Sequence, residues 1–131
     1  MILLDTHVLL WWINDPNKLS KKAKKLIEET TKQKIILVSS FSVWEICLLV
    51  KKGRLGMAMD INILLKKIES LPFIQFIPVD NNIAALSVNL ADPLHNDPAD
   101  RIIIATALLN GATLITADSR ILKYPQVKTL W

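Results

Sequence analysis

Cysteine and long apolar runs are almost absent from this sequence. Its single cysteine, Cys47, excludes a disulfide within the chain, and the apolar residues around it favour a buried thiol in a reducing compartment. The longest uninterrupted apolar run, from Val8 to Ile13, is far shorter than the roughly 18 residues that span a bilayer. Residues 1–5 lack the basic start and the small-residue cleavage site of a signal peptide. We therefore expect a cytoplasmic protein without a membrane segment.

Internal repeats and low-complexity segments are also lacking, so the 131 residues are expected to form one domain, residues 1–131. Hydrophobic residues make up 51% of the chain, which predicts strands buried on both faces and some apolar surface kept for a partner. The net charge is +4, and the basic residues gather in two groups: Lys18, Lys21, Lys22, Lys24 and Lys25, then Lys51, Lys52 and Arg54. Such groups attract polyanions, but the first is equally typical of a solvated helix face.

Short apolar runs alternate with helical patterns along the whole chain. The predicted strands are Ile2–Leu4, Ile35–Val38, Phe73–Ile77 and Thr113–Thr116, with Gln126–Leu130 as a candidate edge strand. The predicted helices are His7–Ile13, Lys21–Lys32 after the N-cap Ser20, Phe41–Lys52, Ile61–Leu71, Asn81–Leu90 and Ala99–Asn110. This alternation predicts an α/β sandwich around a mainly parallel sheet.

Four acidic residues lie beside apolar runs: Asp5, Glu45, Asp100 and Asp118. Asp5 and Asp118 directly follow predicted strands, and in open α/β sheets the ligand crevice lies beyond the carboxyl ends of the strands. Glu45 follows a strand by one or two helical turns, and Asp100 begins a helix that can point back to the same edge. We therefore predict that the four carboxylates converge on one crevice.

Converging carboxylates require a cation, because like charges within a few ångströms oppose joint ionisation. Oxygen ligands without a Cys or His cluster favour Mg²⁺ or Mn²⁺ over Zn²⁺. A divalent ion in such a site lowers the pKa of a bound water and stabilises charge on a leaving oxygen, which suits phosphodiester cleavage. The crevice is therefore predicted to be a nuclease centre.

Each acid would also fit a structural role at a helix start. Asp5 and Asp118 would each cap a following helix, the second a short turn over Ser119–Lys123. Glu45 stands three residues after Ser42, which is the spacing of a capping box. Asp97 fits the cap before Pro98 better than Asp100 does. Any one acid is readily structural, but the four together favour a site.

Four segments in this order together resemble PIN-domain proteins, and among them the VapC-like toxins of bacterial and archaeal toxin–antitoxin modules. The segments are LDTHVLLW (Leu4 to Trp11), SVWEI (Ser42 to Ile46), HNDPADRIIIATA (His95 to Ala107) and LITAD (Leu114 to Asp118). The resemblance implies a PIN-like three-layer sandwich. It also implies a Mg²⁺- or Mn²⁺-dependent ribonuclease, an endonuclease that cleaves RNA phosphodiester bonds.

The resemblance further implies roles for individual residues. Asp5 and Asp100 match the principal metal ligands, and Glu45 and Asp118 match ligands that act directly or through water. Thr116 matches a hydroxyl that orients a carboxylate or a water. Thr6 would do the same or serve as a helix-cap hydroxyl, and Asp97 is a secondary candidate.

Partners are implied in the same way. VapC-like proteins are typically inhibited by a cognate small antitoxin whose tail packs into a groove near the active site. They commonly form homodimers and toxin–antitoxin hetero-oligomers. The apolar surplus, with Trp11, Trp12 and Trp44, is compatible with such a groove, although tryptophans also fill cores.

Two histidines and one arginine lie close to these acids in the sequence. His7 and His95 fit loop or packing positions better than a general base, because a metal-bound water needs no histidine base. Arg101 would either contact a phosphate or pair with Asp97.

Three further functional classes compete with a toxin nuclease. An aspartate-nucleophile phosphotransferase of the haloacid-dehalogenase type would carry a second Asp where this chain has His7. A PIN-type RNA-processing nuclease without an antitoxin is the second class, and a non-catalytic PIN module that binds RNA or protein is the third. Loss of one of the four acids would favour the non-catalytic module, and none of them is missing.

Overall fold

Five short strands form the central sheet in the computed structural model, which describes residues 1–33, 35–54 and 60–131. They are β1 (Ile2–Leu4), β2 (Ile36–Ser39), β3 (Ile74–Ile77), β4 (Thr113–Ile115) and β5 (Thr129–Leu130). Their spatial order is β3-β2-β1-β4-β5, and every pairing is parallel. The predicted parallel sheet is confirmed, and β5 is the predicted edge strand in a shorter form.

Along the chain, the helices of the described residues connect these strands. They are α1 (Thr6–Asn14), α2 (Lys21–Gln33), α3 (Ser40–Lys51), α4 (Ile61–Glu69), α5 (Asn81–Val88), α6 (Pro98–Asn110) and α7 (Ser119–Leu122), with a 3-10 turn η1 (Pro16–Lys18) after α1. The helix α4 ends two residues before the predicted Leu71, because a residue that precedes proline, here Pro72, avoids helical backbone. None of the described helices has the length and apolarity needed to cross a bilayer.

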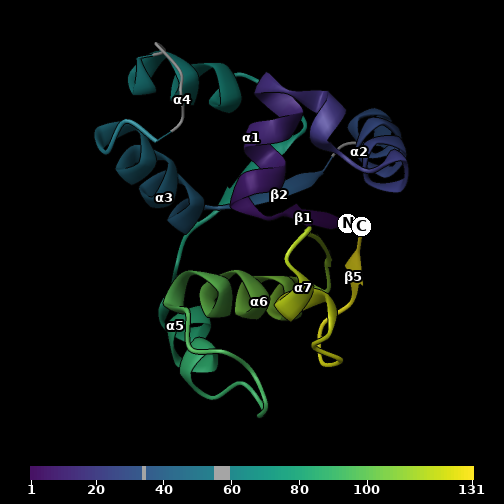
Figure 1. Cartoon of the computed structure of the whole chain (residues 1–131), viewed down its shortest axis with the longest axis vertical. Helices are drawn as coiled ribbons and strands as arrows, with labels where there is room; N and C mark the ends of the chain where they lie inside the picture. The colour runs from purple at the N-terminus through teal and green to yellow at the C-terminus, as the bar shows by residue number, and fades with distance from the viewer. Residues whose placement is uncertain (34, 55–59) are drawn as a thin grey trace.

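Side chains of the inner strands alternate between two apolar layers. Ile2 and Leu4 face one layer, which contains residues of α1, α2, α3 and α4, whereas Leu3 faces the other, which contains residues of α6 and α7. Figure 1 shows α1 to α4 on one side of the sheet and α5 and α6 on the other. The strands β1 and β2 are buried throughout, as predicted, and the three-layer sandwich is confirmed.

The strand order changes direction at β1, and this change positions the site. From β1 the chain moves outward to β2 and β3, and then returns to place β4 on the other side of β1. Beyond β1, the backbone N–H of Asp5 donates to the carbonyl of Ile115 at 3.0 Å, so the two strand ends stay in register. In open α/β sheets a crevice forms at the carboxyl edge of such a switch point.

Candidate functional site

A hollow of about 330 Å³ lies at this switch point and contains all four predicted acids. Its lining residues are Asp5, His7, Trp11, Glu45, Asp97, Asp100, Ala117, Asp118 and Arg120. Elements that are distant in sequence supply the acids, because Asp5 follows β1, Glu45 lies in α3, Asp100 in α6 and Asp118 before α7. The structure thus brings together the carboxylates that the sequence predicted to converge, while their function remains a prediction.

A larger hollow, of about 480 Å³, lies at the opposite ends of the strands. Ile2, Ile35 and Thr113 line it, and its described lining includes no carboxyl group. Size alone would select this second hollow. We favour the smaller one as the functional site, because only its lining supplies a set of convergent titratable groups.

Asp5 is held by hydrogen bonds to both of its carboxyl oxygens. The backbone N–H of Thr6 donates to Oδ1 at 2.8 Å, and the Thr116 hydroxyl donates to Oδ2 at 2.7 Å. The same hydroxyl accepts from the backbone N–H of Asp118 at 3.1 Å. Asp5 therefore caps α1 and faces the hollow at the same time, and Thr116 fixes the position of one acid relative to another.

Glu45 is held by the hydroxyl of Thr6 in α1, and that hydroxyl is in turn bonded by Ser42 in α3. The Thr6 hydroxyl donates to Glu45 Oε1 at 2.6 Å, and Ser42 Oγ lies 2.8 Å from Thr6 Oγ1. Because a hydroxyl has one proton, Ser42 is the donor to Thr6. The alternative of a capping box between Ser42 and Glu45 is wrong, since the N-cap of α3 is Ser39, whose side chain accepts from Phe41 N. The helix-cap role for Thr6 is also wrong, because Asp5 occupies that position.

Asp100 stands in the first turn of α6, where Asp97 is the cap. Asp97 Oδ1 accepts from the backbone N–H groups of Ala99 and Asp100, at 2.9 and 3.3 Å. The cap predicted for Asp97 is therefore confirmed. His95 Nε2 lies 2.7 Å from Asp100 Oδ2, and it is the donor when the carboxyl is ionised. Among the described residues, His95 Nδ1 is the buried side-chain polar atom without a hydrogen-bond partner.

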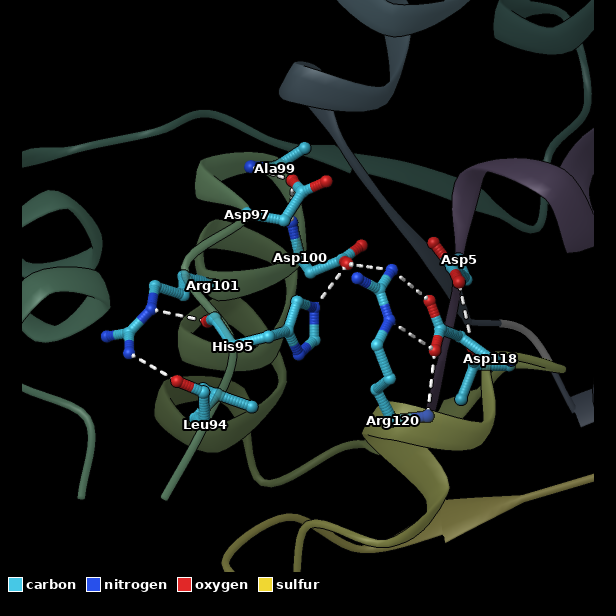
Figure 2. Close-up of polar contacts among 10 residues, drawn as sticks. Asp5, Leu94, His95, Asp97, Ala99, Asp100, Arg101, Asp118 and Arg120 are labelled. Atoms are coloured by element: carbon cyan, nitrogen blue, oxygen red, sulfur yellow. Dashed lines mark hydrogen bonds and ion pairs between the residues drawn. The ribbon is translucent and has the colours of Figure 1, made fainter. Parts of the chain in front are cut away.

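Arg120 places a positive charge among these acids, and Figure 2 shows its guanidinium between Asp100 and Asp118. Its Nη2 lies 2.9 Å from Asp118 Oδ2 and 3.4 Å from Asp100 Oδ2, and its Nε donates to Asp118 Oδ1 at 3.2 Å. Sequence reasoning missed Arg120, and it gave His95 and Ser42 no part in the site. Their closeness in sequence to the predicted acids could have indicated these residues, since Arg120 follows Asp118 by two residues and His95 precedes Asp100 by five.

Burial dominates the electrostatics of the three inner acids. It raises the pKa of Asp5, Glu45 and Asp100 above their ordinary values, while hydrogen bonds from Thr116, Thr6 and His95 respectively oppose the rise. Repulsion from neighbouring carboxylates adds to the raised pKa of each. Asp118 differs, because the hydrogen bond from Arg120 lowers its pKa. Ionisation of the inner acids is therefore poorly compensated by the protein alone.

This donor set fits a hard divalent cation. His95, Asp100 and Asp118 each offer a ligand atom within 4.8 Å of the others, and Asp5 and Glu45 line the same hollow. Five carboxyl groups face one guanidinium there, so the described lining has an excess of negative charge. Oxygen ligands with a single imidazole suit Mg²⁺ or Mn²⁺, whereas structural zinc sites are closed by four ligands rich in Cys and His.

Arg101 binds backbone carbonyls in the structure and not Asp97, the partner that the sequence allowed. Its guanidinium donates to the carbonyls of His95, Ser87 and Leu94, at 2.9, 3.2 and 3.1 Å. These bonds fix the loop that carries His95, and Figure 2 shows two of them on the side of α6 away from Asp5.

The tryptophans divide between the core and the surface. Trp11 and Trp12 pack against the core, as tryptophans commonly do. Trp44 is instead 56% exposed and stacks on Phe41. Trp44 therefore remains available to a partner.

Comparison with known proteins places this geometry in a family. A family model described as PIN domain matches residues 2–127. Ribonuclease VapC22 from Mycobacterium tuberculosis is 31% identical over 132 residues, with 99% of this chain and 98% of that protein covered.

Solved structures give the same result for the fold. VapBC2 from Rickettsia felis, bound to a DNA fragment from its promoter, matches with a TM-score of 0.73 and 20% identity, covering 99% of this chain and 98% of that chain. FitAcB from Neisseria gonorrhoeae matches with a TM-score of 0.72 and 22% identity, covering 100% of this chain and 97% of that chain. This chain, whose sequence already resembled VapC-like proteins, belongs to the PIN-domain family.

Proposed function

We propose that this protein is a divalent-metal-dependent endoribonuclease and the toxin of a toxin–antitoxin pair. The observation that carries the proposal is the convergence of Asp5, Glu45, Asp100 and Asp118 on one hollow at the switch point of a PIN-domain sheet. The name of the mycobacterial relative, a ribonuclease, supports RNA as the substrate. A PIN-type RNA-processing nuclease without an antitoxin is the alternative.

In this proposal Asp5 and Asp100 hold Mg²⁺ or Mn²⁺, and Glu45 and Asp118 act as ligands directly or through water. When bound, such an ion lowers the pKa of a water and neutralises charge on the phosphodiester. Thr116 and Thr6 keep the carboxyl groups of Asp5 and Glu45 oriented through the hydroxyl bonds described above.

His95 orients Asp100 from the other side of the hollow, through the 2.7 Å contact between Nε2 and Oδ2. Arg101 holds the His95 loop in place, because its guanidinium binds the carbonyl of His95 itself. A chain of contacts therefore connects the metal site to a residue that does not line it.

A partly exposed aromatic pair on α3 suits the antitoxin. Trp44 is 56% exposed, and Phe41 stacks against it with the two ring centroids 5.1 Å apart. Large exposed aromatic side chains are typical anchors of protein interfaces. We propose that the antitoxin covers this surface, and that the toxin also forms homodimers and hetero-oligomers with it.

Cleavage of a labelled single-stranded RNA by the purified protein tests the enzymatic part. Glu45→Gln and Asp100→Asn should abolish cleavage without lowering the thermal unfolding midpoint below that of wild type, because each removes a charge whose burial is unfavourable. The matched control is Glu28→Gln, which removes a carboxylate from the exposed face of α2 and should leave cleavage unchanged. EDTA should stop the reaction, and added Mg²⁺ or Mn²⁺ should restore it.

Two results would contradict the assignment. Equal cleavage by Asp100→Asn and wild type would show that a contaminating nuclease was being measured. Cleavage that persists in excess chelator would exclude metal dependence. For the partner, the proposal predicts that a neighbouring reading frame encodes a small antitoxin. Its co-expression with this chain should yield a stable complex without ribonuclease activity, and full activity in that mixture would favour an RNA-processing role.

A further inference from the structure

Arg120 is the one Lys or Arg among the described residues that line the acidic hollow. Its side chain is 55% exposed, so packing does not force it inward. It nevertheless makes three contacts to Asp118 and Asp100 through Nε and Nη2. Electrostatic attraction therefore holds an otherwise free side chain over the carboxylates.

The guanidinium and a divalent ion would draw on the same two carboxyl groups, those of Asp100 and Asp118. Nη2 lies 2.9 Å from Asp118 Oδ2 and 3.4 Å from Asp100 Oδ2. Asp100 and Asp118 also belong to the group whose ligand atoms lie within 4.8 Å of one another. An ion that bridges these carboxylates at about 2.1 Å would lie within a few ångströms of Nη2, where two positive charges repel.

Arg120 also suits the charge of the substrate. An RNA phosphodiester that enters a hollow with five carboxyl groups is repelled unless cations compensate the acids. A guanidinium binds two phosphate oxygens at once through parallel N–H groups. Arg120 additionally borders a neighbouring hollow lined by Asp92, Pro93, Leu94 and His95, so its exposed position lets it swing away from the acids.

We propose that Arg120 is an exchangeable counter-ion of the site, which competes with the divalent ion for Asp100 and Asp118 and moves to the RNA phosphate when the ion binds. The proposal rests on the proposed nuclease function. It assigns to Arg120 two effects of opposite sign. Arg120 weakens metal binding in the free protein, and it strengthens RNA binding in the metal-loaded protein.

The test uses Arg120→Gln and, as a matched control, Lys123→Gln, which removes an exposed positive charge one helical turn further along. Titration of Mn²⁺ into the protein without RNA, followed by the electron paramagnetic resonance signal of free Mn²⁺, measures metal binding. Arg120→Gln should bind Mn²⁺ roughly two- to fivefold more tightly than wild type, the range for loss of an exposed ion pair. Lys123→Gln should resemble wild type.

RNA binding is then measured at saturating Ca²⁺ with a fluorescent single-stranded oligoribonucleotide that is checked to remain intact. Arg120→Gln should bind more weakly at every sequence tested. The slope of log affinity against log salt should fall by about 0.7 to 1, as expected for one lost phosphate contact.

Each failed result has a separate meaning. Equal Mn²⁺ affinity in Arg120→Gln and Lys123→Gln would overturn the competition, and an unchanged salt slope would overturn the phosphate contact, so either result refutes the proposal. A wild-type protein that binds neither Mn²⁺ nor RNA would instead refute the proposed function.

Discussion

Replacement of Thr116 by valine tests whether metal binding depends on the orientation of the Asp5 carboxyl group as well as on its presence. The Thr116 side chain is fully buried, and its hydroxyl donates to Asp5 Oδ2 and accepts from the backbone N–H of Asp118. Valine has nearly the same shape, so packing is preserved while both hydrogen bonds are lost. The carboxyl group of Asp5 remains, but only the Thr6 N–H still holds it.

The expected loss of Mn²⁺ affinity follows from the charge of the hydrogen-bond acceptor, because the Asp5 carboxyl group is ionised when it binds a metal. A hydrogen bond to a charged group contributes about 1.5–3 kcal/mol. Because about 1.4 kcal/mol is a factor of ten, Thr116→Val should weaken Mn²⁺ binding roughly 10- to 100-fold. Loss of the Thr116 hydroxyl also removes a hydrogen bond that lowers the pKa of Asp5, so Mn²⁺ binding should be weakened more at lower pH.

Two further variants make this result specific. Thr106 is equally buried, and its hydroxyl donates to the Ile102 carbonyl at 2.7 Å inside α6, so Thr106→Val should leave Mn²⁺ affinity unchanged. Thr116→Ser keeps the hydroxyl and should retain most of the affinity, although the lost methyl group costs about 1 kcal/mol of folding stability.

Calorimetric titration of Mn²⁺ into the three variants gives the comparison. If Thr116→Val binds Mn²⁺ as tightly as Thr106→Val, Asp5 is not a metal ligand oriented by Thr116.

Three further predictions concern stability, pH and the partner. Arg101→Met should lower the free energy of unfolding by about 2–4 kcal/mol in urea titrations, because three carbonyls lose their donor. An unchanged midpoint would show that the loop that carries His95 is stable without these hydrogen bonds. The metal-free protein should lose stability as pH rises from about 4, since burial raises the pKa of Asp5, Glu45 and Asp100 and the folded state therefore binds more protons than the unfolded chain. Bound Mn²⁺ should reduce this loss of stability. A free energy of unfolding that increases with pH over the same range would contradict the prediction. Trp44→Ser should weaken antitoxin binding by a factor of ten or more in pull-down titrations while RNA cleavage is unchanged, and equal binding would place the antitoxin elsewhere.

Much of the arrangement of the acids could be predicted from the sequence, because a parallel sheet imposes it. Asp5 and Asp118 follow buried runs, and the carboxyl ends of parallel strands meet at one edge. The cap at Asp97 was equally predictable, since an acid before Pro98 matches a common helix start. These features depend on local pattern and on one rule of topology.

The contacts between side chains were not predictable in the same way. The spacing of Ser42 and Glu45 fits a capping box, and only the observed start of α3 after Ser39 shows that Ser42 instead faces Thr6 across two helices. The position of Arg120 depends on an exposed rotamer, which attraction to Asp100 and Asp118 decides and no periodicity encodes.

Anomalous diffraction from a crystal soaked in Mn²⁺ would locate the proposed metal ion itself. We expect a peak inside the hollow, about 2.0–2.3 Å from carboxylate oxygens of Asp5 and Asp100, and no such peak in Asp100→Asn. A peak at another place, or none in crystals of a protein that cleaves RNA, would contradict the assignment of these acids as its metal site.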